Sequence, residues 1–344
     1  MVGVALLGAG IYAKEAHIPA LIENKGTLLA VYSRSTKSAN SVVDEVSKLG
    51  GQTSGIDVYS DEEASRGLDE LLQRTDIDAV IVVLPIPTQP DVVLKCLAAG
   101  KHVLCEKPIA KDVATGRALV QEYEKTYAPK NLVLAVAEQF RYDRAYIRAR
   151  DIIASGEIGN LEHVHARVWS DLQPGSKYYE TAWRKVPEYQ GGFILDGGVH
   201  FVALMRLVSG QEIIETKSLA IQLKPHLPPV DTVNAALRFS GGATGSLSFS
   251  WASKKSAFEF IFAGSKGSIT MRMGAIWGTS IMEIESEGKE RTESIEGKAM
   301  FEEIKAFLAA TASGKVEKAG SSQEALADLA VIESVLSGSG IVQS

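Results

Sequence analysis

The first third of the chain alternates short apolar runs with amphipathic stretches, and this alternation limits the possible folds more than any other feature. We expect strands at residues 2–7, 28–32, 79–84, 102–105 and 132–135. Helices are expected between them, at residues 13–24, 38–48, 62–73, 91–99 and 114–123. Apolar strands joined by helical crossovers form parallel sheets that are covered on both faces. The pattern therefore predicts a doubly wound α/β domain, in which Pro19 bends or restarts the first helix.

After about residue 140, apolar residues alternate singly with polar ones, as at residues 163–168, 233–239, 247–251 and 258–262. A period of two describes antiparallel strands with one buried face. The length of 344 residues suggests about two domains. We expect the parallel-sheet domain at residues 1–128 and, at residues 129–344, an α+β domain with a large, mostly antiparallel open sheet. The other face of that sheet is either a contact with a partner subunit or solvated surface.

Charge and composition exclude several classes of function. The net charge is −6 and is spread along the chain, whereas nucleic-acid binding proteins carry a basic patch. No apolar run approaches the roughly 18 residues of a membrane helix, and the apolar N-terminus lacks the basic residues of a signal peptide. Cys96 and Cys105 have no metal-ligand or CxxC spacing and are expected to be buried thiols. We therefore expect a cytoplasmic protein that binds neither nucleic acid nor membrane.

A glycine-rich turn follows the first expected strand and opens the first expected helix. It reads Gly8-Ala9-Gly10-Ile11-Tyr12-Ala13, which is the G-x-G-x-x-A form of the dinucleotide fingerprint. Gly8 permits a tight turn, Gly10 lets backbone amides approach a pyrophosphate, and Ala13 permits close packing of helix on strand. The amides at the start of the helix favour an anion. The turn predicts a dinucleotide site.

The end of the second expected strand indicates which dinucleotide is bound. NAD-binding chains place Asp or Glu there for the ribose 2′-hydroxyl, but here residues 32–37 contain no acid. Ser33, Arg34, Thr36 and Lys37 instead offer hydroxyls and two cations, which suit a 2′-phosphate. The alternative is a surface turn whose arginine contacts only solvent. We predict a preference for NADP(H) over NAD(H).

Glu106-Lys107-Pro108 follows the expected strand at residues 102–105. Ligands of open α/β sheets lie beyond the carboxyl ends of the strands. A lysine at such an end can hydrogen-bond a reacting hydroxyl or carbonyl oxygen. This places Lys107 among the candidate catalytic residues.

A second cluster of polar residues lies at residues 191–200. If the segment is helical, Asp196 and His200 are four residues apart and share one face. Gly197 and Gly198 each cost a helix about 1 kcal/mol relative to alanine. This cost is explained if a nicotinamide ring or substrate approaches the backbone closely. The alternative is an ordinary core helix.

In this order and spacing, the three motifs resemble the Gfo/Idh/MocA oxidoreductase family, and the resemblance covers essentially the whole chain. It implies a Rossmann domain followed by an α/β domain with a large open sheet, and NAD(P)-dependent chemistry on sugars, inositols and polyols. Because the nicotinamide itself carries the hydride, no metal is required, and the sequence shows no ligand cluster for one. The resemblance also implies a homodimer or homotetramer formed through that sheet. The family's catalytic lysine and acid–base pair correspond to Lys107, Asp196 and His200.

The resemblance and the motifs together give the candidate cofactor-binding residues. These are Gly8, Gly10, Ile11, Tyr12, Ser33, Arg34, Thr36, Lys37, Leu84, Pro85, Gln89, Glu106, Lys107, Trp183 and Arg184. Two positions depart from the family pattern, because Gln89 replaces a common histidine and Ala203 replaces a common aspartate. Both departures argue against assuming inositol or a standard sugar as substrate.

We therefore expect an NADP(H)-dependent dehydrogenase or reductase acting on CH–OH groups. His200 would exchange the hydroxyl proton, Lys107 would stabilise charge on the oxygen, and Asp196 would hold the imidazole or bind a neighbouring substrate hydroxyl. The alternative is a non-catalytic NADP(H)-binding regulator on the same scaffold. An enzyme of the aspartate-semialdehyde or glyceraldehyde-phosphate type would need a nucleophilic cysteine early in the second domain. Both cysteines precede Glu106, so this class is excluded.

The aromatic residues of the second domain leave the substrate open. Tyr142, Tyr178, Tyr179, Trp183 and Arg184 could line a pocket with stacking and hydrogen-bonding surface. Such a pocket suits a carbohydrate, and it equally suits a small aromatic diol or aldehyde.

Overall fold

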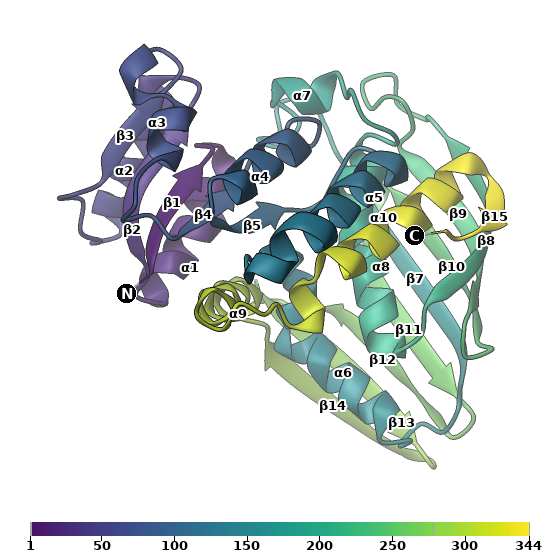
Figure 1. Cartoon of the computed structure of the whole chain (residues 1–344). Helices are drawn as coiled ribbons and strands as arrows, with labels where there is room; N and C mark the ends of the chain where they lie inside the picture. The colour runs from purple at the N-terminus through teal and green to yellow at the C-terminus, as the bar shows by residue number, and fades with distance from the viewer. Residues whose placement is uncertain (1, 277, 344) are drawn as a thin grey trace. The chain divides into compact units, whose positions relative to one another are not determined.

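The computed structural model describes residues 2–276 and 278–343 (Figure 1). The chain forms two compact units. The first unit comprises Met1–Ala110, Ala114–Glu138 and Met300–Ala325, and the second unit comprises Lys111–Val113, Gln139–Ala299 and Leu326–Ser344. This division differs from the expected boundary after residue 128. The strand Leu134–Ala137 and most of the helix Ala299–Ser313 also belong to the first unit.

The first unit contains a parallel sheet of six strands in the order β3-β2-β1-β4-β5-β6. Its strands are β1 (Gly3–Leu7), β2 (Thr27–Ser33), β3 (Asp57–Ser60), β4 (Ala79–Val82), β5 (His102–Glu106) and β6 (Leu134–Ala137). The order reverses between β1 and β4, as in doubly wound folds. The parallel-sheet prediction is confirmed, but β3 was not predicted and β6 lies two residues later than expected.

Helices connect these strands and cover the sheet. They are η1 (Ala13–His17), α1 (Ile18–Glu23), α2 (Thr36–Lys48), η2 (Ala64–Arg66), α3 (Leu68–Leu72), α4 (Gln89–Ala98), α5 (Val113–Glu122), η3 (Tyr123–Tyr127), η4 (Ala128–Lys130), α9 (Ala299–Ser313) and η6 (Lys318–Gly320). Pro19 occupies the first turn of α1, so the first helix restarts there as predicted. Helix α9 adds Ile304 and Phe307 to the core around β1 and β4. This contribution explains why a segment 160 residues after β6 belongs to the first unit.

The second unit contains a nine-stranded sheet in the order β14-β13-β12-β11-β7-β10-β9-β8-β15. Its strands are β7 (Leu161–Asp171), β8 (Ile213–Ile221), β9 (Thr232–Phe239), β10 (Thr244–Ser250), β11 (Ala252–Gly264), β12 (Gly267–Met273), β13 (Thr279–Ser286), β14 (Lys289–Glu296) and β15 (Ser339–Ile341). All neighbours are antiparallel except β7 and β10. The predicted open, mostly antiparallel sheet is confirmed.

Helices cover one face of this sheet. They are η5 (Gln139–Tyr142), α6 (Arg144–Ala154), α7 (Ala182–Lys185), α8 (Phe193–Ser209) and α10 (Ser322–Ser337). Helix α8 packs on β7 and β10, and α6 packs on β13 and β14 (Figure 1). Phe249 and Phe260 are fully buried on this face. Alternation along the strands therefore separates a core face from an open face.

The open face carries a row of opposite charges. Arg167, Glu259, Arg272 and Glu283 lie on neighbouring strands and form successive ion pairs. Within residues 2–276 and 278–343, none of the helices is long and apolar enough to cross a membrane.

Candidate active site

The glycine-rich turn has the backbone that a dinucleotide loop needs. Gly8 adopts a φ of +111°, and a Cβ there would lie 2.1 Å from the Val83 carbonyl oxygen, so only glycine fits. A Cβ on Gly10 would meet none of the described atoms within 4 Å. Ala13 is fully buried against the sheet, as predicted. The turn thus leaves open space beside the start of a helix, which fits a pyrophosphate.

Two further predicted residues lie close to this turn. Leu84 and Pro85 follow β4, and the Leu84 side chain borders the space above Gly8. Tyr12 directs its hydroxyl to the Met300 sulfur at 3.3 Å. The loop therefore contacts the residues after β4 on one side and α9 on the other.

The turn formed by Glu106, Lys107 and Pro108, here called the Lys107 corner, is fixed by buried partners. Glu106 ends β5, and its Oε1 lies 2.6 Å from Nε2 of His17, with both side chains buried. The other carboxylate oxygen of Glu106 accepts the Lys107 backbone N–H at 3.1 Å. On the far side of the corner, Gln89 donates from Nε2 to the Pro108 carbonyl at 3.1 Å. The backbone from residue 106 to residue 108 is thus held from both sides.

Gln89 requires a revised role. The sequence suggested that it contacts the cofactor, but its side chain is fully buried. Such a side chain has no surface for a dinucleotide, so Gln89 supports the Lys107 corner instead.

A buried acid lies behind this corner. Glu303 of α9 is 1% exposed, and neither of its carboxylate oxygens has a hydrogen-bond partner among the described residues. Burial raises the pKa of Glu303 well above its ordinary value, and the charges of Glu106 and Glu138 raise it further. The protonated form of Glu303 is therefore favoured relative to an exposed glutamate. No sequence pattern marked this residue, because α9 is remote in the chain.

The ribose end of the dinucleotide site contains acids that the sequence prediction missed. Tyr32, the last residue but one of β2, donates its hydroxyl to Asp61 at 2.6 Å. Thr36, at the start of α2, donates its backbone N–H to Glu62 Oε2 at 2.9 Å. Both acids follow β3, the strand that was not predicted. Arg34 and Lys37 are exposed, as a phosphate-binding role requires.

In the second unit, α8 carries Asp196 and His200 on one face, as predicted. Asp196 Oδ2 accepts from Arg184 Nε at 2.7 Å, and both side chains are largely buried. The Arg184 guanidinium also stacks over Trp183 at 4.0 Å. His200 stacks on Phe140 with ring centroids 4.8 Å apart. Asp196 therefore anchors Arg184, a role that the sequence analysis did not assign to it.

The paired glycines of α8 have a packing role. A Cβ on Gly197 would lie 2.5 Å from Trp251, and one on Gly198 would lie 3.0 Å from Ile332. The prediction that these glycines admit a nicotinamide or substrate is therefore replaced. The groups that approach the backbone there are side chains of the second unit itself.

The predicted aromatic residues are placed differently from one another. Tyr142 is buried in the core, whereas Tyr178 lies under the Arg184 guanidinium at 5.6 Å and Tyr179 meets His226 edge to face. Tyr189 contacts Trp183 and is 6% exposed, and its hydroxyl has no hydrogen-bond partner among the described residues.

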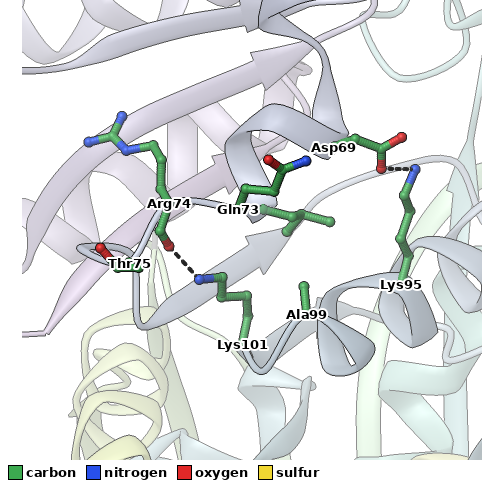
Figure 2. Close-up of a pocket in the computed structure, with 8 residues that line it drawn as sticks. Asp69, Gln73, Arg74, Thr75, Lys95, Ala99 and Lys101 are labelled. Carbon is green, nitrogen blue, oxygen red and sulfur yellow. Dashed lines mark hydrogen bonds and ion pairs between the residues drawn. The ribbon is translucent and has the colours of Figure 1, made fainter.

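A separate hollow of about 480 Å³ lies in the first unit, where residues 73–76 and Lys101 precede β4 and β5. Figure 2 shows that two lysines at this hollow are bonded to other residues of the protein. Lys101 donates to the Arg74 carbonyl, and Lys95 forms an ion pair with Asp69. It faces the amino ends of the strands, away from the glycine-rich turn. For these reasons we exclude it from the candidate active site.

In the part of the chain that the structure describes, no three His, Cys, Asp or Glu side chains are grouped to hold a metal ion. The candidate residues fall in both units, with Lys107 in the first and Asp196 and His200 in the second.

Comparison with known proteins gives two family matches. Residues 2–130 match the oxidoreductase family with an NAD-binding Rossmann fold, and residues 146–270 match the GFO/IDH/MocA C-terminal domain. Dehydrogenase FPY6 of Fusarium mangiferae is 38% identical over 98% of this chain and 96% of its own length. The trans-1,2-dihydrobenzene-1,2-diol dehydrogenase of Mus musculus is 28% identical over 67% of this chain and 65% of its own length.

Solved structures agree with these matches. The crystal structure of an oxidoreductase from Thermotoga maritima is 31% identical to this chain and superposes with a TM-score of 0.86, covering 99% of this chain and 98% of that one. Identity above 30% along nearly the full length, together with matches to both domains, assigns the chain to the GFO/IDH/MocA oxidoreductases, with an NAD-binding Rossmann domain as its first part.

Proposed function

We propose that this oxidoreductase uses NADP(H) and transfers a hydride between nicotinamide C4 and the carbinol or carbonyl carbon of a sugar, polyol or small aldehyde or ketone. The observation that carries the proposal is the Lys107 corner. Glu106 on one side and Gln89 on the other fix the backbone from which the Lys107 side chain extends, at the carboxyl end of β5.

The cofactor would be held by the residues of the first unit. Gly8 and Gly10 leave room for the pyrophosphate at the start of the first helix. Arg34 and Lys37 supply cations for the 2′-phosphate, and the hydroxyls of Ser33 and Thr36 supply further hydrogen bonds. The bound nicotinamide carries the hydride.

The remaining chemistry belongs to side chains of the protein. Lys107 would donate a hydrogen bond to the substrate oxygen and stabilise its negative charge. His200 would take the hydroxyl proton in oxidation and return it in reduction. The stacking of its ring on Phe140 restricts the orientation of the imidazole. Asp196 would act through Arg184, which it holds in place.

The charges of the second unit favour a neutral substrate. Arg184 and Asp196 form an ion pair, so together they offer donors and acceptors without net charge. Hydroxyl groups match this combination better than a carboxylate or phosphate does. The mouse relative is named for a cyclic vicinal diol, a dihydrobenzene-1,2-diol, which supports a vicinal hydroxyl compound as substrate for this chain.

We also propose that the open face of the nine-stranded sheet contacts a second copy of the chain, in a homodimer or homotetramer. Leu219 and Ile221 of β8 are 81% and 54% exposed on this face. Burying such apolar side chains against a partner is favourable, and the molar mass in solution, measured by light scattering, tests the assembly.

The second candidate function is a non-catalytic NADP(H)-binding regulator. We favour the enzyme because the cation at Lys107, the acid–base group at His200 and the Asp196 carboxylate are all present. A panel of polyols, keto-sugars, aldehydes and trans-1,2-diols, assayed for NADPH oxidation or NADP reduction, separates the two. Turnover on any member supports the enzyme. Tight NADPH binding with no turnover on the whole panel supports the regulator.

A further inference from the structure

A carboxylate of the chain itself occupies the helix start next to the ribose end of the dinucleotide site. Glu62 Oε2 accepts the backbone N–H of Thr36 at 2.9 Å. Thr36 is the first residue of α2, and its side-chain hydroxyl lies 2.8 Å from that of Ser60. The first backbone amide of α2, which lies in the chain between the two exposed cations, is therefore already bonded to an anion.

Neighbouring contacts tie this position to the dinucleotide loop. The Gly8 N–H donates to the Tyr32 carbonyl at 2.8 Å, so the turn after β1 lies beside the end of β2. Ser33 of β2 pairs with Ser60 of β3, which places Asp61 and Glu62 at the same edge of the sheet. All of these contacts lie within the first unit.

We propose that Glu62 is a specificity-determining residue that competes with the cofactor's 2′-phosphate for the Thr36 amide. The proposal rests on the assignment of an NADP(H) site to Ser33, Arg34, Thr36 and Lys37. A phosphate arriving there must displace the Glu62 carboxylate. A ribose hydroxyl brings no charge and needs no such displacement.

The charge balance gives this competition a consequence. The segment that carries Arg34 and Lys37 lies at the same edge of the sheet as Asp61 and Glu62, so carboxylates offset part of the positive charge there. Burial and the hydrogen bond to Asp61 raise the pKa of Tyr32, whereas the positive charge of Arg34 lowers it. This effect indicates that Arg34 lies near the Tyr32 hydroxyl. Glu62 therefore narrows the preference for NADPH over NADH below what the two cations alone would give.

The test compares dissociation constants of NADPH and NADH, measured by fluorescence titration. Glu62→Gln keeps the shape of the side chain and removes its charge, and Glu62→Ala removes the acceptor as well. Both variants are expected to bind NADPH about threefold to tenfold more tightly, the range for the net contribution of one ordinary hydrogen bond. NADH affinity is expected to stay within about twofold.

Glu63→Gln is the matched control, since it removes the same charge one residue away and, among the described residues, its side chain makes no hydrogen bond or ion pair with α2. It should change both affinities equally and by less than about twofold. Adenosine 2′-phosphate and adenosine 5′-phosphate serve as probes of the phosphate position alone. Only the 2′-phosphate should bind more tightly to Glu62→Gln.

Three results would overturn the inference. These are unchanged NADPH affinity in both Glu62 variants, an equal gain for NADPH and NADH, or a loss of NADH affinity, which would make Glu62 a ribose ligand. Arg34→Ala separates this failure from failure of the proposed function. If Arg34→Ala weakens NADPH while Glu62→Gln changes nothing, only the role of Glu62 is rejected. If the wild-type protein binds neither dinucleotide, the cofactor assignment is rejected as well.

Discussion

Two acids on the last two helices are equally buried but differ in their partners. Asp328 of α10 is 2% exposed and is bonded by Arg141 through both carboxylate oxygens at 2.7 Å, and by Arg206 at 2.6 Å. Glu303 of α9 is 1% exposed, and neither carboxylate oxygen has a hydrogen-bond partner among the described residues. The charges that act on Glu303 are those of two other carboxylates, Glu106 and Glu138.

Partners set the environment of a buried acid as much as burial does. Two arginines offset the charge of Asp328, whereas burial among acids raises the pKa of Glu303. The second unit therefore contains a fixed ion network around α8 and α10. The first unit contains a buried acid of raised pKa close to the Glu106–His17 pair.

The largest effect is expected from Asp328→Asn. This change keeps the shape of the side chain but leaves Arg141 and Arg206 buried without their shared counter-charge. The free energy of unfolding should fall by about 3–5 kcal/mol, as measured by urea denaturation. Asp151→Asn, which breaks an exposed pair with Arg150, is the control and should cost less than about 1 kcal/mol. Equal effects of the two variants would contradict the comparison.

The second prediction concerns pH. Below the ordinary glutamate pKa of 4.5, Glu303 is protonated in both the folded and the unfolded state. As the pH rises above that value, the unfolded state loses the proton first, so stability falls until the folded-state pKa is passed. Glu303→Gln removes this dependence. The free energy of unfolding of Glu303→Gln minus that of wild type should therefore be larger at pH 8 than at pH 5.

Urea denaturation of both proteins across this pH range checks the prediction. Glu302→Gln is the control, because Glu302 is the preceding residue of α9 and pairs with the exposed Lys305. Its difference from wild type should show the opposite trend or none. A pH-independent difference for Glu303→Gln would mean that Glu303 is ionised in the folded protein.

The smallest effect is expected from Tyr189→Phe, which tests a buried polar group without charge. Burial raises the pKa of Tyr189, and the charge of Asp196 raises it further. Removing a hydroxyl that has no partner should leave the free energy of unfolding within about 1 kcal/mol of wild type, with the change on the stabilising side. A loss of 2 kcal/mol or more, as an order of magnitude for a lost buried hydrogen bond, would reveal a partner.

The sequence predicted the features that depend on local pattern. The strands β1, β2, β4 and β5, the glycine-rich turn and the helical spacing of Asp196 and His200 all follow from runs of neighbouring residues. Strand β3 was missed because Asp57–Ser60 is short and carries only two apolar side chains. The second unit's sheet was predicted by alternation alone.

Contacts between residues that are far apart in the sequence could not be predicted from local patterns. His17 and Glu106 are 89 residues apart, and nothing in either motif indicates that they pair. Gly197 indicated a close approach, but only the structure shows that Trp251 makes it. The Glu62 contact with Thr36 depends on β3, so missing that strand also hid the acids at the ribose end.

The most direct test of the central claim follows a deuteride from 4-deuterated NADPH into product, first with the substrate panel and then in two variants. The wild-type protein should transfer the label to carbon. Lys107→Met and His200→Ala should each lower the transfer rate at least about 100-fold, or roughly 2.7 kcal/mol of transition-state stabilisation, while binding NADPH within about threefold of wild type. Near-normal transfer in both variants, or NADPH binding without any transfer by the wild type, would contradict the claim.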